Sequence, residues 1–280
     1  MSDDIIYKDS TGTVRTVSTA NPLPVSDTNS EDNLDVILGN VSGKRYINKM
    51  GERESMVVAA AGEDIWRGNE LSPAGDQLIP TPSDSGEQMS LVSESGNDSA
   101  AGTGVQEVTI EYLDGSGNEV TMAYETNGTT AVALASDISF INDMYASRTG
   151  SNGVSADHIK IYKTATGTGH VYDMIAQGGN KSLVPHFKVP TGHCLAVLGW
   201  HAEEAQDKRI NIRLRATATP SGDVNPAYLF IDPAYIRKGS TGPLTVHRKV
   251  PAGGIVKVSG WCDQNASECS VGWHGILVEE

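Results

Sequence analysis

Two fifteen-residue stretches near the carboxyl end decide the fold: HFKVPTGHCLAVLGW at residues 186–200 and HRKVPAGGIVKVSGW at residues 247–261. They share eight identical positions at an offset of 61 residues, in the pattern HxKVPxGxxxxVxGW. Agreement of this density within one chain indicates an internal structural repeat. In each copy we expect a strand that ends at Lys-Val, a tight turn, and a second strand that runs back to Gly-Trp as a hairpin.

The repeat places its two turns at Pro190 with Gly192 and at Pro251 with Gly253. We expect each proline at the second position of its turn and each glycine at the fourth. Further strands, expected at residues 209–216, 227–231 and 269–278, bring the total to seven or eight. This number of short antiparallel strands predicts a β-sandwich of jelly-roll type over residues 179–280.

The second strand of each copy has two faces that the repeat distinguishes. The aligned residues Leu195 and Val256 are expected on the core side. Trp200 and Trp261 share the other face and would point outward, either as interface anchors or as platforms on which a sugar stacks. The alternative is a kink at the preceding glycine, which would return the tryptophan to the edge of the core.

Residues 105–178 are expected to form a small α+β unit. A hairpin around the DGSGN turn and a strand pair at residues 158–163 and 170–175 supply its sheet. One helix is predicted from a cap at Ser136, with its apolar face formed by Ile138, Ile141, Met144 and Tyr145. Residues 63–104, rich in Pro, Ser, Asp and Gly, are expected to be an irregular connection.

Residues 1–62 are expected to form an N-terminal attachment arm. A short hairpin is predicted around residues 9–12, and the Asn-Pro-Leu-Pro-Val segment at residues 21–25 is extended because proline restricts both its own φ and the preceding residue. Such an arm suits docking by addition of a strand to another protein. A disordered tail is the alternative. The apolar side chains that would fill the partner's pockets are Tyr7, Val14, Val17, Leu23 and Val25.

Composition favours a mainly β protein with no nucleic-acid partner. The 280 residues include 30 glycines and 12 prolines but only 6% aromatic residues, which is typical of short strands joined by turns. The formal net charge is −14, and residues 1–130 carry 7 basic and 22 acidic side chains. Phosphate backbones would be repelled by such a surface. No apolar run approaches the roughly 18 residues that span a membrane, and the acidic start MSDDIIYKD is unlike a secretory leader, so we expect a soluble protein without membrane insertion.

Candidate metal and catalytic chemistry is weak. The cluster of His186, His193 and His201 with Cys194 lies on both sides of a turn and on alternating strand faces, so we expect structural histidines rather than zinc ligands. Residues 114–125 resemble a calcium loop, but Glu119 stands where the loop needs glycine, which favours a plain hairpin. No nucleophile occurs with a base and an orienting partner. We therefore expect no enzymatic activity, no metal and no cofactor.

The three cysteines point to a reducing site of synthesis. Their number is odd and no CxxC pair occurs. Cys262 and Cys269 flank a turn at a separation that suits a hairpin, and whether they are bonded stays open at this stage.

Three segments resemble a family of structural proteins of tailed-bacteriophage particles, of the capsid-decoration or head-fibre type. These are TGTVRTVSTANPLPV at residues 11–25, ESGNDSAAGTGVQEVTIEYLDGSGNEVTMAYETNGTT at residues 94–130, and the VPxG-built sandwich that closes in GWHGILVEE. The resemblance implies a structural role on the virion, assembly in the cytoplasm of the bacterial host, and a homotrimer. The arm would attach to the major capsid protein or to tail or neck proteins, and the sandwich would oligomerise and face outward.

Two alternatives remain. Within the same class, the chain would be a tail or neck adaptor or a receptor-binding component. In a different class, it would be a carbohydrate-binding module that uses Trp200 and Trp261 as stacking platforms for a host surface glycan.

Overall fold

The computed structural model describes residues 6–8, 14–16, 44–67, 77–164, 167–217 and 227–280. The chain divides into two compact units, Met1–Ser42 and Gly43–Glu280. In the first unit β1 (Ile6–Lys8) pairs antiparallel with β2 (Val14–Thr16), as the sequence predicts. Tyr7 and Val14 of the predicted arm lie on these strands, whereas Val17, Leu23 and Val25 lie outside the described residues.

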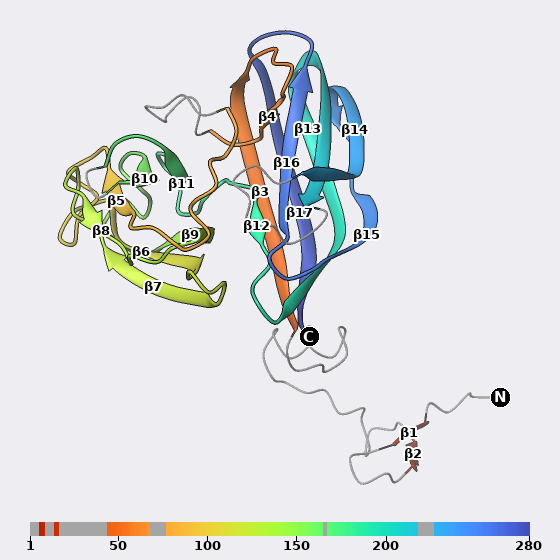
Figure 1. Ribbon diagram of the computed structural model, residues 1–280, viewed down its shortest axis with the longest axis horizontal. Coiled ribbons are helices and arrows are strands. Elements are labelled where there is room, and N and C mark those ends of the chain that lie inside the picture. Colours follow the sequence, from red (N-terminus) through yellow and green to blue (C-terminus); the bar gives the residue numbers. More distant parts are fainter. Residues whose placement is uncertain (1–5, 9–13, 17–43, 68–76, 165–166, 218–226) are drawn as a thin grey trace. The chain divides into compact units, whose positions relative to one another are not determined.

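Every named element of the described residues is a strand, which confirms the mainly β class (Figure 1). No described segment forms a helix long and apolar enough to cross a membrane. The strands of the second unit are β3 (Lys44–Met56), β4 (Glu63–Asp64), β5 (Ser90–Ser93), β6 (Val105–Leu113), β7 (Glu119–Glu125), β8 (Val132–Ala133), β9 (Phe140–Thr149), β10 (Ile159–Tyr162), β11 (Val171–Ile175), β12 (Phe187–Lys188), β13 (His193–Thr217), β14 (Tyr228–Ser240), β15 (Leu244–Val250), β16 (Ile255–Cys262) and β17 (Ser267–Glu279).

The large sandwich is built around the 25-residue strand β13. The sheet has the order β12-β16-β13-β17-β3, with β14 and β15 also paired to β13 and β4 to β16. The first half of β13 lies between β15 and β17, and its second half, from Arg209 on, lies between β14 and β16. Residues from both halves form one apolar core, which includes Leu195, Val197, Val256 and Val258 on the side that the repeat predicts.

Strand β3 belongs to this sandwich rather than to an arm over residues 1–62. It pairs with β17 along most of its length, and Ile47 and Met56 enter the core. The other inward positions between them are Lys49, Gly51 and Arg53, all buried. A strand whose inward side is polar or glycine does not show the alternation that identifies strands in a sequence.

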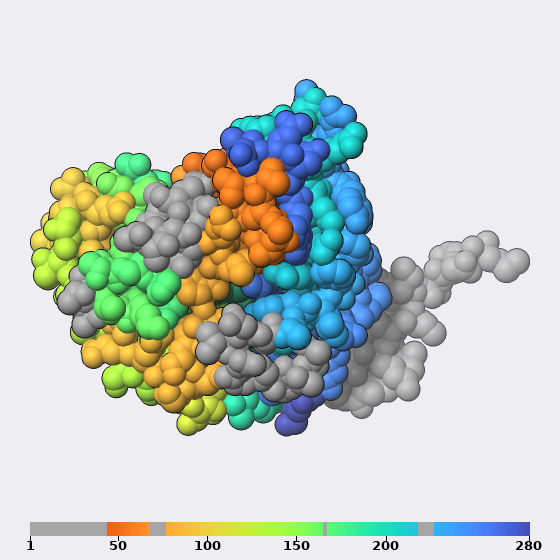
Figure 2. Space-filling model, turned by 45° about the horizontal axis from the view of Figure 1, so that its top comes forward, coloured from red at the N-terminus to blue at the C-terminus, as the bar shows by residue number. Residues whose placement is uncertain are grey.

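The segment after β3 is held to the end of the sandwich. The Val58 amide donates to Asn265 Oδ1 at 2.8 Å. Figure 2 shows the orange residues that follow β3 beside the dark-blue turn after β16. Residues 57–62 therefore connect β3 to β4 along the large sandwich and are part of its structure.

The predicted α+β unit is a second, smaller sandwich. A four-stranded sheet of order β11-β10-β5-β8 and a three-stranded sheet of order β7-β6-β9 enclose one apolar core. Strand β5 comes from the stretch that was expected to be an irregular connection, and it pairs with both β10 and β8. The hairpin of β6 and β7 is confirmed, with Asp114 Oδ1 accepting the amides of Ser116 and Asn118 in the turn.

The helix predicted from Ser136 is wrong. Residues 140–149 form β9, and Ile138, Ile141 and Met144 are buried in the small core. The pairing of β9 with β6 shifts register between Ile141 and Asp143, so a bulge falls at Asn142. Because a bulge adds one residue, Ile141 and Met144 reach the same side at a spacing of three, which imitates a helical face.

Candidate functional site

The two VPxG turns do not close hairpins. β12 pairs with β16, and β15 pairs with β13, so the leading strand of each repeat copy pairs with the trailing strand of the other copy. The turns also bond to each other: the Val189 amide donates to Gly254 O at 2.9 Å, and the Gly253 amide donates to Val189 O at 2.8 Å. The repeat therefore forms one joint structure with exchanged strands.

The position of each residue in these turns also differs from the prediction. The His193 amide donates to Pro190 O, and the Gly254 amide donates to Pro251 O, so each proline is the first residue of its turn. The third residue is Gly192 or Gly253, with φ of 74° and 73°. A positive φ at the third position is the requirement of a type II turn, and it explains the glycines.

The two repeat tryptophans occupy opposite faces. A register shift between Val197 and Gly199 makes a bulge, which turns Trp200 into the core at 1% exposure, where its indole N–H donates to Asp232 Oδ2 at 3.0 Å. Strand β16 has no such shift, and Trp261 stays on the outer side. Trp200 is therefore a core residue and not an outward anchor, in agreement with the alternative of a kink at the glycine.

A second short repeat escaped the sequence analysis. Gly-Trp-His occurs at residues 199–201 of β13 and at residues 272–274 of β17, and the two tripeptides pair antiparallel in register. Both tryptophans are buried, and each histidine lies over the glycine opposite: a Cβ at Gly272 would come within 2.4 Å of the His201 ring, and one at Gly199 within 2.7 Å of the His274 ring. The signal was present in the sequence as three identical letters.

These imidazoles belong to an outward-facing surface that we call the histidine face. Tyr46 is 49% exposed and its ring stacks with His274 at 6.0 Å between centroids, while Met50 is 51% exposed and lies opposite Gly272. Exposed apolar side chains that gather on one sheet face are typical of a contact surface. The residues of the histidine face are Tyr46, Met50, His201, His274 and Ile276.

A second surface, the aromatic–arginine face, covers the outer side of β14, β13 and β16. The Arg213 guanidinium lies 4.3 Å from the ring centroid of Phe230 and 4.3 Å from that of Trp261. Arg215 and Lys257 lie over the ring of Tyr228, at 5.2 and 4.3 Å. Cations stacked on aromatic rings in this way hold the side chains in place. The residues of this face are Arg209, Asn211, Arg213, Arg215, Tyr228, Phe230, Tyr235, Arg237, Lys257, Trp261 and Asp263.

A buried carboxylate anchors one end of the aromatic–arginine face. Asp64 is fully buried, and its oxygens lie 2.8 Å from Lys257 Nζ and 3.5 Å from the nearest guanidinium nitrogen of Arg215. Burial alone would raise the pKa of Asp64, but Lys257, Ser259 and Arg215 hold it below its ordinary value. These two cations are therefore neutralised by Asp64, whereas at the opposite end of the face Arg237 pairs with Asp207 at 3.0 Å.

That opposite end holds an open groove of about 460 Å³. Its floor is the backbone at Ile210, Ile236 and Cys262, whose side chains enter the core. Asn211 stands in register with Tyr235 on one side and with Trp261 on the other. Arg209, Arg237 and Asp263 complete the lining.

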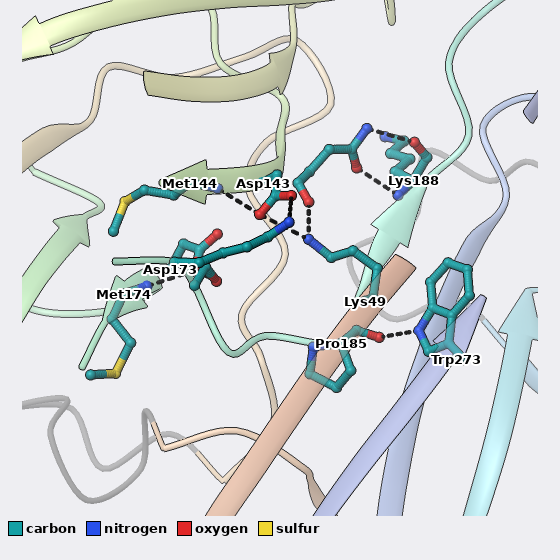
Figure 3. A network of polar contacts seen from close by, with 11 residues as sticks. Lys49, Asp143, Met144, Asp173, Met174, Pro185, Lys188 and Trp273 are labelled. Carbon is teal, nitrogen blue, oxygen red and sulfur yellow. Dashed lines mark hydrogen bonds and ion pairs between the residues drawn. The ribbon is translucent and has the colours of Figure 1, made fainter. Parts of the chain in front are cut away.

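The two sandwiches meet at a polar network (Figure 3). Buried Lys49 of β3 donates to Asn142 O, and its ammonium lies 3.4 Å from Asp143 Oδ1. The Asn142 side chain exchanges two hydrogen bonds with the backbone of Lys188, at 3.0 and 2.8 Å. Beside it the Trp273 indole donates to Pro185 O at 2.9 Å. The bulge at Asn142 thus positions an amide that joins the small sandwich to the large one.

Two titratable groups buried at this contact have strongly shifted pKa values. Burial raises the pKa of the Asp173 carboxyl to about 7, against the opposing effect of Lys49, and its Oδ1 accepts from the Met174 amide and the Ser182 hydroxyl. Burial lowers the pKa of His186 to about 3, and its ring packs at 4.6 Å from that of Phe140. His186 is thus neutral and structural.

The remaining side chains that could bind a metal ion lie apart from one another or already contact other protein groups. His193 contacts Thr191 O, His201 is exposed on the histidine face, and Cys194 is a buried free thiol. Within the described part of the chain, the one group of three potential ligands within 4.8 Å is Glu94, Asp157 and His158. There Lys160 Nζ lies 2.6 Å from Glu94, and His158 Nδ1 accepts the Gln177 amide.

Comparison with known proteins adds little. No family model matches the sequence, and no curated protein matches it. A solved structure, the N-terminal tandem CBM22-1–CBM22-2 domain of Xyn10C from Paenibacillus barcinonensis, is 12% identical, over 85% of this chain and 94% of that chain, with a TM-score of 0.23.

Proposed function

We propose that the chain is a non-enzymatic structural protein of a tailed-bacteriophage particle, in which the large sandwich oligomerises and the N-terminal arm attaches. The observation that carries the proposal is the histidine face. Tyr46 and Met50 expose about half of their surface beside the paired imidazoles of His201 and His274. A second copy of the chain would bury these side chains without any loss of core packing.

The rigidity of the face supports this role. It lies on β3, β17 and β13, which are paired on both sides of the bulge before Gly199, and the two buried tryptophans lie directly beneath it. A surface held by such a core changes little on association, which favours repeated assembly of identical subunits. The segments that resemble phage structural proteins support the particle as the place of assembly.

The oligomer is tested on the full chain by native mass spectrometry and light scattering. We expect a trimer for the natural sequence and dissociation for Met50→Glu, because a carboxylate in the contact is left unpaired. Met122→Glu is the matched control, since Met122 is 43% exposed on β7 of the small sandwich. A monomer at all concentrations, or equal effects of both substitutions, would contradict assembly through the histidine face.

The location is tested on particles. Removal of residues 1–30 should leave a soluble oligomer that no longer binds to virions, whereas full occupancy without the arm would contradict its role. Labelled electron microscopy and the copy number per particle separate decoration of the capsid from the alternative of a tail or neck adaptor.

A further inference from the structure

We propose that the groove at the end of the aromatic–arginine face binds a carbohydrate that carries a carboxylate group. This inference goes beyond the structural role, and it does not use the histidine face. The groove volume, about 460 Å³, falls within the roughly 300–1,000 Å³ of small-molecule sites. Because its floor is sheet backbone with packed side chains beneath, the groove is formed before a ligand arrives.

Tyr235 supplies the stacking platform. It is 79% exposed, the highest value among the large apolar side chains of the described residues. An aromatic ring kept in water beside a groove gains contact area when the flat C–H face of a sugar ring covers it. Phe230, on the same strand β14, is also exposed, but it stacks with Arg213 and does not line the groove.

Trp261 forms a wall and not a platform. A Cβ at Gly62 would come within 2.4 Å of the indole, so the Gly62 backbone lies against the ring, while Arg213 stacks at 4.3 Å from its centroid. Its N–H donates to Ala60 O at 3.3 Å. A sugar on Tyr235 would therefore meet the edge of the indole, with Asn211 between the two aromatic residues.

The charges in the groove select an anionic sugar. Arg237 uses its Nε to donate to Asp207 Oδ1 at 3.0 Å, and no carboxylate in the described part of the chain pairs with its terminal nitrogens. Arg209 lies directly opposite in register; its backbone amide donates to Asp263 Oδ1 at 3.3 Å, and its guanidinium forms no ion pair within the described residues. Guanidinium groups bind carboxylates through two parallel hydrogen bonds. The guanidinium nitrogens that Arg209 and Arg237 present to the open groove therefore fit a carboxylate.

The polar groups beside the arginines favour a sugar over a phosphate. Asp263 lines the groove, and its carboxylate accepts hydrogen bonds from hydroxyls, which a sugar ring carries and a fully ionised phosphate group lacks. The Asn211 amide offers both donors and an acceptor to the same hydroxyls. One groove thus combines an aromatic ring for stacking, guanidinium groups for a carboxylate, and polar side chains for hydroxyls. An acidic sugar requires this combination.

Binding is tested by calorimetry on the full chain with three probes: oligogalacturonate, oligoalginate and polysialic acid. We expect saturable binding of at least one. The methyl ester of oligogalacturonate keeps the ring and masks the charge, so it should bind at least tenfold more weakly than the free acid. Equal binding of acid and ester, or no binding of any probe, would overturn the proposal.

Substitutions locate the site. Tyr235→Ala and Arg209→Gln should each weaken binding at least tenfold, while Phe230→Ala, on the same strand but outside the groove, should leave it unchanged. Circular dichroism and oligomeric state should match the natural protein for all three. Binding that survives both groove substitutions, or polyglutamate that binds as tightly as the sugar, would overturn the assignment. Since trimer formation is measured separately, its failure and that of the groove are distinguishable.

Discussion

Trp200 of β13 and Trp273 of β17 lie directly opposite each other in the antiparallel register, and both rings are buried in the core of the large sandwich. Each indole N–H has an acceptor, Asp232 Oδ2 for Trp200 and Pro185 O for Trp273. The pair therefore ties the central strands to β14 on one side and to the segment leading into β12 on the other.

The repeat tryptophans should differ sharply in their contribution to stability. Trp200→Ala removes a fully buried ring and leaves Asp232 without its donor, so we expect a loss of about 3–5 kcal/mol in the free energy of unfolding. Trp261→Ala, at the equivalent position but half-buried, should cost less than about half of that. Urea unfolding of the two variants checks this, and equal losses would contradict the inward turn at the bulge.

Gly192→Ala should destabilise the protein only through the backbone conformation of the type II turn. Its φ is 74°, and a Cβ added there would meet nothing within 4 Å, so no steric contact contributes. Gly192→Ala should therefore cost about 1–2 kcal/mol, the price of a left-handed residue. Gly192→Asn should cost less, because asparagine tolerates this conformation. Thermal unfolding gives the order, and a stabilised alanine variant would rule out the turn.

Asp173 should make stability depend on pH. Its folded pKa, about 7, is above its ordinary value of 3.8, so the stability it confers is complete below pH 4 and is lost as the pH rises through 7. The free energy of unfolding of Asp173→Asn, measured relative to that of the natural protein, should thus increase by about 3 kcal/mol from pH 5 to pH 8, at about 1.4 kcal/mol per pKa unit.

Asp114→Asn is the control for this experiment. Hydrogen bonds from Asn118 and from the Ser116 amide hold the pKa of Asp114 below its ordinary value, so it is ionised at both pH values. Its substitution should change stability equally at pH 5 and pH 8. Urea titrations at both pH values measure the free energy of unfolding. If the difference between Asp173→Asn and the natural protein does not vary with pH, Asp173 is not a buried acid that is protonated at pH 5.

The cysteines should react only after unfolding. All three are free and buried, and burial raises the pKa of both Cys262 and Cys269. A thiol kept protonated and covered reacts slowly. Titration with a disulfide reagent at pH 8 should find almost no reactive thiol in the native protein and three in guanidinium. A single thiol in guanidinium would instead reveal a Cys262–Cys269 bond.

The sequence predicted features correctly where the structure of a residue depends only on its neighbours in the same strand or turn. The turn at Asp114 and the core positions Leu195 and Val256 follow from local turn chemistry and from alternation. The same reasoning failed at β9, where a bulge at Asn142 imitated helical spacing, and at β3, whose inward positions include Lys49 and Arg53. Those two side chains are buried because their partners, Asp143 and Glu63, lie on other strands.

By itself the amino-acid sequence determined the mainly β class, the repeat and the positions of its turns, because glycine, proline and side-chain alternation act through the backbone of neighbouring residues. Only the tertiary structure decided which strands pair across the repeat, which of the two tryptophans turns inward, and that Tyr235 and Arg209 line one groove. These features depend on register between strands that are distant in sequence, and a shift of one residue moves every side chain to the opposite face.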